Sequence, residues 1–305
     1  MIYTITLNPS IDYTVTVEDL ALGELNKIKE EFKFPGGKGI NVSRILTRLE
    51  TENTALGFIG GFTGDFIEKS LSNEGINQNF TKIAADTRIN IKLKAQTETE
   101  INGQGPEISL AEQLDLKAKL AAATTGDIVI FSGSQPPSLA ADFYTELIEI
   151  VQKNGAQFVI DTTGQSLLAA LPYQPLLIKP NHHELGELFN VTLNSLSEIM
   201  PYGQKLLDLG AQNALVSMGK DGALLFTKAG VYQAPPLEGT LINSVGAGDS
   251  MIAGFTSQLS GSAVNLLKAF SYGVAAGSST AFSRDLATAD KIHGMEKNVI
   301  INHMV

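Results

Sequence analysis

The sequence predicts an α/β fold in which a doubly wound, mostly parallel sheet is flanked by helices. Short apolar, β-branched runs alternate with stretches of helical period, which favours βαβ units with right-handed crossovers. Several of the apolar runs lack polar alternation, as expected of strands that are covered on both faces. Most of the runs end at Gly, Pro, Asn or Asp, which are typical boundaries of strands.

Six segments carry the strand pattern and four carry a helical period. The expected strands are residues 2–7, 54–59, 127–131, 157–160, 176–178 and 214–217. The expected helices are residues 42–49, 140–152, 195–209 and 262–281. Residues 222–227 and 231–234 resemble a hairpin. Because the chain has no internal repeat, low-complexity tract or long linker, we expect residues 1–305 to form a single α/β domain.

Three further segments, residues 13–17, 30–34 and 88–102, do not fit the alternation of apolar strands and helices. Their polar and apolar residues alternate, which is typical of strands in a sheet with one wet face. We interpret them as a small, discontinuous β-sheet lid that is built from insertions. Edge strands of the main sheet are the alternative interpretation.

The composition excludes several classes of protein. The 305 residues include 22 basic and 32 acidic side chains, and the net charge of −10 argues against a nucleic-acid partner but not against a pocket for a small anion. The absence of Cys excludes disulfides, thiolate metal sites and a Cys nucleophile. No basic leader is present and no apolar run approaches the ~18 residues of a membrane span, so we expect a cytoplasmic protein without a membrane partner.

The strongest chemical signal lies in residues 243–255, where small residues precede a helical pattern. The backbone N–H groups of Gly246, Ala247 and Gly248 would lie at a helix N-terminus, where an anion is favoured. Asp249 follows in the first turn of this helix. It can take a proton from a hydroxyl that attacks a phosphoryl group, or it can simply complement the helix dipole. The spacing alone leaves both roles open.

A second glycine-rich segment, residues 34–42, comes immediately before the helix expected at 42–49. Its glycines allow the backbone to approach a ligand closely, Lys38 supplies a cation, and Asn41 offers a donor and an acceptor to sugar hydroxyls. Neither glycine segment has the spacing of a Walker A loop or of the dinucleotide-binding fingerprint. These two classes of nucleotide-binding protein are therefore disfavoured.

Residues 36–44 (Gly-Gly-Lys-Gly-Ile-Asn-Val-Ser-Arg) and 243–249 (Asn-Ser-Val-Gly-Ala-Gly-Asp) resemble the two signatures of the ribokinase-like (PfkB) carbohydrate kinase family. The signatures occur in the family's order, and the resemblance extends from residues 6–12 to beyond Gly277. It implies a ribokinase-like fold with a small β-sheet lid. It also implies that Asp249 is the catalytic base and that Gly246, Ala247 and Gly248 form the anion hole.

The resemblance further assigns binding residues for the sugar, for ATP and for Mg²⁺. The sugar would be bound by Asp12, Gly37, Lys38 and Asn41. ATP would be bound by Lys179, Asn181, Ser217, Gly219, Gly222 and Gly248, although an ordinary hairpin connection is the alternative for residues 217–222. Glu184 would lie near Mg²⁺, partly through water, which suits an ion that needs only one or two carboxylates. His182 and His183 do not share a helix face, so we interpret them as incidental rather than as metal ligands.

The remaining cations bear on the identity of the sugar. Arg88, Asn90 and Lys92 are two apart on an expected lid strand, so their side chains share one face. Arg and Lys together suit a sugar phosphate, and a solvated strand face is the alternative. Residues 87–106 resemble the 1-phosphofructokinase branch of the family more than tagatose-6-phosphate kinases. Ser134 matches a position near the substrate in phosphosugar kinases.

We therefore predict an ATP- and Mg²⁺-dependent kinase that phosphorylates the C6 hydroxyl of D-fructose 1-phosphate, giving fructose 1,6-bisphosphate and ADP. Tagatose-6-phosphate kinase and 6-phosphofructokinase are the alternatives on the same fold, and a non-catalytic phosphosugar-binding regulator is the alternative from another class. A dinucleotide-dependent dehydrogenase fails because the first strand is not followed by the glycine fingerprint. A monovalent-cation requirement and a homodimer that pairs through the lid are left open.

Overall fold

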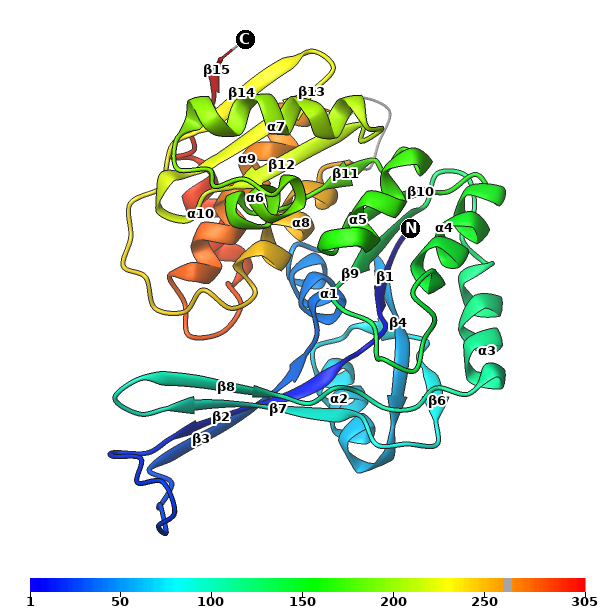
Figure 1. The fold of residues 1–305 in the computed structure, drawn as a ribbon, viewed down its shortest axis with the longest axis vertical. Coiled ribbons are helices and arrows are strands. Elements are labelled where there is room, and N and C mark those ends of the chain that lie inside the picture. Colours follow the sequence, from blue (N-terminus) through cyan, green and yellow to red (C-terminus); the bar gives the residue numbers. More distant parts are fainter. Residues whose placement is uncertain (260–264, 305) are drawn as a thin grey trace.

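An eleven-stranded sheet forms the middle layer of the protein in the computed structural model, which describes residues 1–259 and 265–304 (Figure 1). Its strands follow the order β15 (Asn302–His303), β14 (Gly230–Ala234), β13 (Ala223–Thr227), β12 (Asn213–Ser217), β11 (Leu177–Ile178), β10 (Gln157–Asp161), β9 (Ile128–Ser132), β1 (Ile2–Thr6), β4 (Asn53–Gly60) and β5 (Asn77–Gln78), and β6 (Thr81–Ile83) also pairs with β4. The pairs from β12 to β5 and β6 are parallel, whereas β12 to β15 pair antiparallel. All six expected strands and the expected hairpin are confirmed.

Helices cover both faces of the sheet. The first face is covered by α3 (Leu110–Leu120), α4 (Phe143–Lys153), α5 (Gly164–Ala170), α6 (His182–Phe189) and α7 (Leu196–Asp208). The second face is covered by α1 (Lys38–Arg48), α8 (Ala247–Ser257), α9 (Leu266–Ala281) and α10 (Ala289–Glu296). In β9, Val129 and Phe131 are buried in the first layer and Ile128 and Ile130 in the second. This burial on both sides explains the uninterrupted apolar runs and confirms the doubly wound fold.

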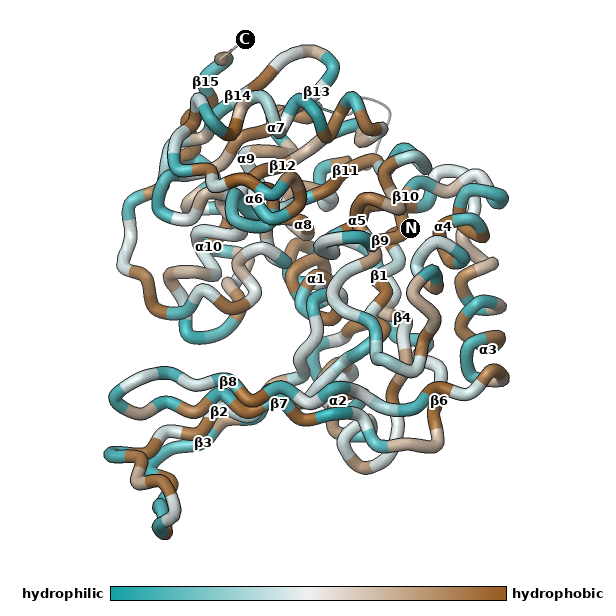
Figure 2. The backbone as a smooth tube through the Cα atoms, viewed as in Figure 1, coloured by the Kyte–Doolittle hydropathy of each residue, from teal (hydrophilic) through white to brown (hydrophobic). Residues whose placement is uncertain are grey.

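Figure 2 shows the same pattern as hydropathy, because hydrophobic residues follow the strands and helices inside the body of the protein. A third cluster joins α1 to α2 (Gly61–Asn73) and to the start of the small sheet, through Ile40, Ile67 and Ile11. Two short 3₁₀ turns, Leu171–Tyr173 and Gly219–Asp221, complete the connections.

The helix predictions were right in place and less so in extent. The first helix begins at Lys38 rather than at residue 42, so part of the glycine-rich segment is already helical. The helix expected at 262–281 begins at Leu266, and residues 262–264 lie outside the described residues. Five helices were not anticipated, namely α2, α3, α5, α6 and α10.

The alternating pieces form a separate four-stranded sheet, which extends from the body in Figure 1. Its order is β3 (Glu30–Gly36), β2 (Ser10–Thr16), β7 (Arg88–Lys94) and β8 (Glu98–Asn102). In Figure 2 this arm changes between hydrophilic and hydrophobic along its strands. The expectation of a small separate sheet is confirmed, and edge strands of the main sheet are excluded as the interpretation. Its role as a lid stays a prediction, as does the assignment of residues 1–305 to one domain.

The strand order sets the position of the site. From β1 the chain adds β4, β5 and β6 on one side, and it then returns to place β9 on the other side. In open α/β sheets a crevice forms at such a reversal, outside the carboxyl ends of the strands. Among the described residues, no helix combines the length and the hydropathy that crossing a membrane requires.

Candidate active site

A cavity of about 960 Å³ opens at the carboxyl ends of the central strands, between the sheet, the start of α1, the start of α8 and the small sheet. Most of the residues singled out in the sequence line it. Those expected to bind sugar are Asp12, Gly37, Lys38, Asn41, Arg88, Asn90 and Ser134. The others are Lys179, Asn181, Glu184, Ser217, Gly219, Gly246, Gly248 and Asp249.

Three of the singled-out residues do not line this cavity. Lys92 lines a neighbouring cavity of about 620 Å³, which shares Asp12 and Asn41 with the first. Ala247 and Gly222 are absent from both linings. The two cavities therefore form adjoining parts of one cleft that runs under the small sheet.

Asp249 lies in the first turn of α8 and is 6% exposed. Gly246 caps this helix with φ of 77°, a left-handed conformation that glycine adopts without strain. The amide of Asn41 donates a hydrogen bond to Oδ2 of Asp249 at 2.8 Å. Burial raises the pKa of Asp249 to about 6, and the negative charge of Asp161 adds to this rise. The carboxylate is thus poised to exchange a proton near neutral pH.

The N-terminus of α8 offers backbone donors to the same cavity. The N–H of Ala247 already donates to the carbonyl oxygen of Ser244 at 3.2 Å, so within the described residues Gly246 and Gly248 are the better placed donors. A Cβ on Gly248 would stand 2.9 Å from Nζ of Lys179, so glycine is what allows this ammonium group to approach the helix. Helix N–H groups and a cation at one point make a strong anion site.

Asp161, a buried carboxylate that the sequence did not reveal as a site residue, pairs with two cations of the cleft, Lys38 and Lys179. Asp161 is 3% exposed at the end of β10, and its oxygens lie 3.0 Å from Nζ of Lys38 and 3.4 Å from Nζ of Lys179. These two cations lower the pKa of Asp161 in spite of its burial, and Asp161 in turn raises the pKa of Lys38. The signal in the sequence was the position of Asp161 directly after a buried strand, where the carboxyl ends of parallel strands meet.

Asp12 faces the cleft from β2. Its Oδ1 accepts hydrogen bonds from the hydroxyl of Ser10 at 2.8 Å and from the amide of Asn90 at 3.1 Å. A Cβ on Gly36 would stand 2.5 Å from this carboxylate, so a side chain at position 36 would displace Asp12. Asn90 is therefore a neighbour of Asp12 that fixes its orientation.

The two cations of the small sheet, Arg88 and Lys92, have partners of their own. Arg88 donates from Nε and Nη2 to the carbonyl oxygen of Asn8, at 3.2 and 2.9 Å, and from Nη1 to that of Gly103 at 2.7 Å. A guanidinium has five N–H groups, so two remain for a ligand. Lys92 lies 2.6 Å from a carboxylate oxygen of Glu100 on β8. The structure thus positions Arg88 firmly and holds Lys92 by a partly exposed ion pair.

The Asn-x-x-Glu segment forms a capping box at the start of α6. The side chain of Asn181 accepts from the N–H groups of His183 and Glu184, both at 2.9 Å, and Glu184 Oε2 accepts from the N–H of Asn181 at 2.8 Å. The second oxygen of Glu184 is free of this box. The rings of His182 and His183 lie 3.8 Å apart, but among the described residues no group of three or more His, Asp or Glu is placed to hold a metal ion.

The cleft is also where buried polar atoms lack partners. In the described part of the chain seven buried side-chain atoms have no hydrogen-bond partner, and five of them belong to residues that line the larger cavity. These five are Thr6 Oγ1, Asn8 Oδ1, Ser132 Oγ, Gln135 Oε1 and His182 Nδ1. Unpaired buried polar groups are costly and rare, so their concentration here suits a cleft that water or a polar ligand fills.

The comparisons with known proteins agree with this geometry. The model of the pfkB family carbohydrate kinases matches residues 5–291. The 1-phosphofructokinase of Bacillus subtilis (strain 168) is 47% identical to this chain over the full length of both, and the D-tagatose-1-phosphate kinase of Bacillus licheniformis is 39% identical, also over the full length of both. The crystal structure of phosphofructokinase-2 from Escherichia coli in complex with fructose-6-phosphate superposes with a TM-score of 0.90 at 30% identity, and the match covers 98% of each chain.

The chain belongs to the pfkB family of carbohydrate kinases. The resemblance noted in the sequence is therefore confirmed, and with it the class of enzyme and the fold.

Proposed function

We propose that this kinase transfers the γ-phosphoryl group of ATP to the C6 hydroxyl of D-fructose 1-phosphate, giving fructose 1,6-bisphosphate and ADP. The observation that carries the proposal is the pairing of a buried carboxylate with a helix N-terminus in one cleft, because Asp249 and Gly248 are neighbours in α8. A base and an anion hole are two of the groups that assist phosphoryl transfer to an alcohol.

Asp249 acts as the base. Its Oδ2 accepts the hydrogen bond from Asn41, which leaves Oδ1 free of that bond, and the residue lines the cavity. As the C6 oxygen forms its bond to the γ-phosphorus, the hydroxyl proton passes to Asp249 and the bond from phosphorus to the ADP oxygen breaks. With a pKa of about 6, Asp249 is mostly ionised at neutral pH and still basic enough to take the proton.

The charge that spreads over the transferred phosphoryl oxygens is met by the N–H groups of Gly246 and Gly248 and by the ammonium group of Lys179. These groups are fixed before ATP binds, so they need no reorganisation during transfer. Asp161 pairs with Lys179 and Lys38 and so holds both ammonium groups close to the cleft. Asn181, Ser217 and Gly219, on the neighbouring wall, contribute the remaining contacts to the nucleotide.

The residues near Glu184 suit Mg²⁺, which prefers to keep several waters and to share its coordination between substrate phosphates and one or two carboxylates. Glu184 has one carboxylate oxygen outside its capping box, and the described residues form no larger metal-binding cluster. When bound, Mg²⁺ neutralises charge on the ATP phosphates. Glu184 is the side chain that would hold it, and the capping box sets the direction of its carboxylate.

The sugar phosphate lies under the small sheet. Asp12 and Asn41 bind its hydroxyls, Arg88 offers two N–H groups to its phosphate, and Lys92 stands further along the cleft. Residues 13–17, 30–34 and 88–102 act as the lid over this substrate. A homodimer would form through the same sheet, whose outer strands leave Phe32 and Ile101 exposed.

Tagatose phosphates are the second candidate substrates, because a relative named D-tagatose-1-phosphate kinase matches the whole chain. Fructose 1-phosphate is preferred because the relative named 1-phosphofructokinase is more similar, at 47% identity against 39%. A silent regulator is disfavoured, since binding alone does not require a buried base with a raised pKa.

The proposal is tested by incubating the protein with ATP, Mg²⁺ and fructose 1-phosphate and following release of ADP, with the position of the new phosphate determined by ³¹P NMR. We expect ADP release that depends on the sugar phosphate and a product phosphorylated at C6. The absence of sugar-dependent ADP release would contradict the proposal.

A further inference from the structure

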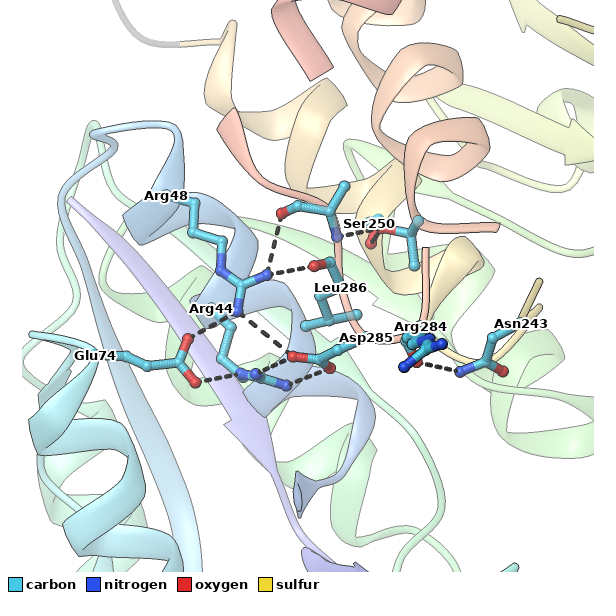
Figure 3. A network of polar contacts seen from close by, with 10 residues as sticks. Arg44, Arg48, Glu74, Asn243, Ser250, Arg284, Asp285 and Leu286 are labelled. Carbon is cyan, nitrogen blue, oxygen red and sulfur yellow. Dashed lines mark hydrogen bonds and ion pairs between the residues drawn. The ribbon is translucent and has the colours of Figure 1, made fainter. Parts of the chain in front are cut away.

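An arginine of α1, Arg44, is held between two acidic residues. Arg44 is 4% exposed, and its Nη1 and Nη2 donate to the two carboxylate oxygens of Asp285 at 3.2 and 2.7 Å. Its Nε donates to Glu74 at 2.8 Å. Figure 3 shows the Arg44 fork facing Asp285, with Glu74 on its other side. Three fixed bonds leave this guanidinium almost no rotational freedom.

Arg48, one turn further along α1, joins the same network. Its Nη1 donates to the carbonyl oxygens of Leu286 and Ala287 at 2.6 and 3.0 Å, and its Nη2 donates to Glu74 at 3.1 Å. We call Arg44, Arg48, Glu74 and Asp285 the arginine clamp. Its two positive and two negative groups balance, and it ties the loop between α9 and α10 to α1 and to the end of α2.

The clamped loop lies directly against the start of α8. Leu286 is 7% exposed, and its Cδ2 lies 2.6 Å from the place where a Cβ on Gly246 would stand. Hydrogen bonds make a second link, because the N–H of Ala287 donates to Thr280 Oγ1 at 3.1 Å, and this oxygen lies 2.8 Å from Ser250 Oγ. Ser250 in turn donates to the carbonyl oxygen of Gly246 at 2.8 Å. The place of Gly246 therefore depends on the place of the loop.

Helix α1, which supplies both arginines of the clamp, also supplies Asn41, and Asn41 donates a hydrogen bond to Asp249. Helix α1 therefore contacts both parts of the site. It holds Asp249 through Asn41, and it holds the loop that packs against Gly246 through the arginine clamp. We propose that Arg44 is a positioning residue for phosphoryl transfer, which acts through Asp285 and Leu286 to set Gly246 relative to Asp249. This inference rests on the proposed function, because it concerns the same anion hole.

The expected signature is a loss of rate without a loss of affinity. The N–H groups at the start of α8 act on charge that develops in the transition state, so their displacement lowers kcat more than it raises KM. Arg44→Lys keeps the charge and loses the two-pronged bond to Asp285. Since small displacements of catalytic groups can cost up to ~10²-fold in rate, we expect Arg44→Lys to lower kcat by ~10-fold or more, with both KM values changed by less than about threefold.

The second variant is Leu286→Ala, which removes the packing against Gly246 and leaves every charge in place. If Arg44 acts through this loop, the double variant Arg44→Lys/Leu286→Ala loses little more than the worse single variant, because both changes break one path. Asp285→Asn, which keeps the size of the side chain and removes its charge, should match Arg44→Lys. It serves as a substitute if Arg44→Lys does not fold.

The experiment measures kcat, both KM values and the melting temperature for the wild type and these variants, at a temperature at which all are folded. Lys117→Ala is the matched control, because it also breaks a partly buried ion pair, the one with Glu146 at 2.6 Å. This pair joins α3 to α4 on the first face of the sheet, whereas α1 covers the second face. We expect this control to keep its kcat. An active wild type with unchanged kcat in Arg44→Lys would overturn the inference and leave the proposed function standing.

Two other results would also overturn it. A rise in the KM for the sugar phosphate alone would mean that Arg44 binds the substrate directly, since Arg44 also lines the smaller cavity. Fully additive losses in the double variant would mean that Leu286 does not transmit the effect. If the wild type itself released no ADP with any sugar phosphate, the proposed function would fail, which is a different outcome.

Discussion

The carboxylate of Asp249 and the amide of Asn41 are 208 residues apart in the chain and are joined by a hydrogen bond of 2.8 Å in the cleft. This bond connects the two glycine-rich segments, one at the start of α1 and the other at the start of α8. It orients a buried carboxylate next to helix N–H groups. The role proposed for Asp249 leads to three predictions about rate, pH and stability.

Replacement of the base should remove most of the activity. We expect Asp249→Asn to lower kcat by at least ~10²-fold, which is the scale of general-base catalysis, because the amide cannot accept the hydroxyl proton. ATP binding should be retained, as measured by calorimetry with the unreacted nucleotide. Turnover close to that of the wild type would contradict the assignment of Asp249.

The pH profile should report the same carboxylate. The pKa of Asp249 in the free protein is raised to about 6, chiefly by burial and also by Asp161. The value of kcat/KM should therefore rise with pH up to about 6, with about a tenfold gain per unit well below this point, and then level off. Removing the negative charge in Asp161→Asn should move this limb to lower pH. A limb that moved to higher pH in this variant would rule out the electrostatic account.

The buried negative charge of Asp249 should also lower the free energy of unfolding at neutral and alkaline pH. A raised pKa in the folded state means that the protonated form is favoured on folding, so the stabilising contribution is complete below the unfolded pKa and is lost as pH rises through about 6. Asp249→Asn removes the buried charge and should increase the free energy of unfolding by on the order of 3 kcal/mol at pH 8. Urea titrations at pH 8 and pH 4 measure this, and the difference should be much smaller at pH 4, which lies just above the ordinary pKa of an Asp carboxyl, 3.8. A variant less stable than the wild type at pH 8 would contradict the burial argument.

The cations of the small sheet should act on substrate binding. Lys92→Ala should raise the KM for fructose 1-phosphate while the KM for ATP stays nearly constant, because Lys92 lines the cleft at its outer end. Lys33→Ala is the matched control. Lys33 also pairs with an acidic residue of the sheet, Glu31, but lies in neither cavity lining. Equal effects in the two variants would argue against a phosphate contact at Lys92.

The main sheet could be predicted from the sequence because strands that are buried on both faces consist of uninterrupted apolar residues. Each expected strand is an apolar run between turn residues, and each is buried in the structure. Helix α2 was missed because its apolar residues do not trace its buried face. Phe62 is 70% exposed, whereas Thr63 and Gly64 are buried. The start of α3 was recognisable in hindsight, since Ser109 and Glu112 form a capping box.

The parts of the site that could be predicted from the sequence are the two glycine-rich segments, residues 34–42 and 243–249, because each combines glycines with a functional side chain. What the sequence did not reveal was the pairing of charges. Asp161 gathers Lys38 and Lys179 from distant parts of the chain, and no local pattern specifies such partners. Likewise Arg88 on the expected lid strand is partly committed to backbone carbonyl oxygens, which is visible only once the strands are placed.

The central claim is the identity of the accepted sugar phosphate. The most direct measurement is kcat/KM with ATP and Mg²⁺ for fructose 1-phosphate, fructose 6-phosphate, tagatose 1-phosphate and tagatose 6-phosphate under one set of conditions. The account predicts that fructose 1-phosphate gives the highest value and that Asp249→Asn abolishes most of the turnover with each sugar that reacts. A higher value for either tagatose phosphate, or for fructose 6-phosphate, would contradict it.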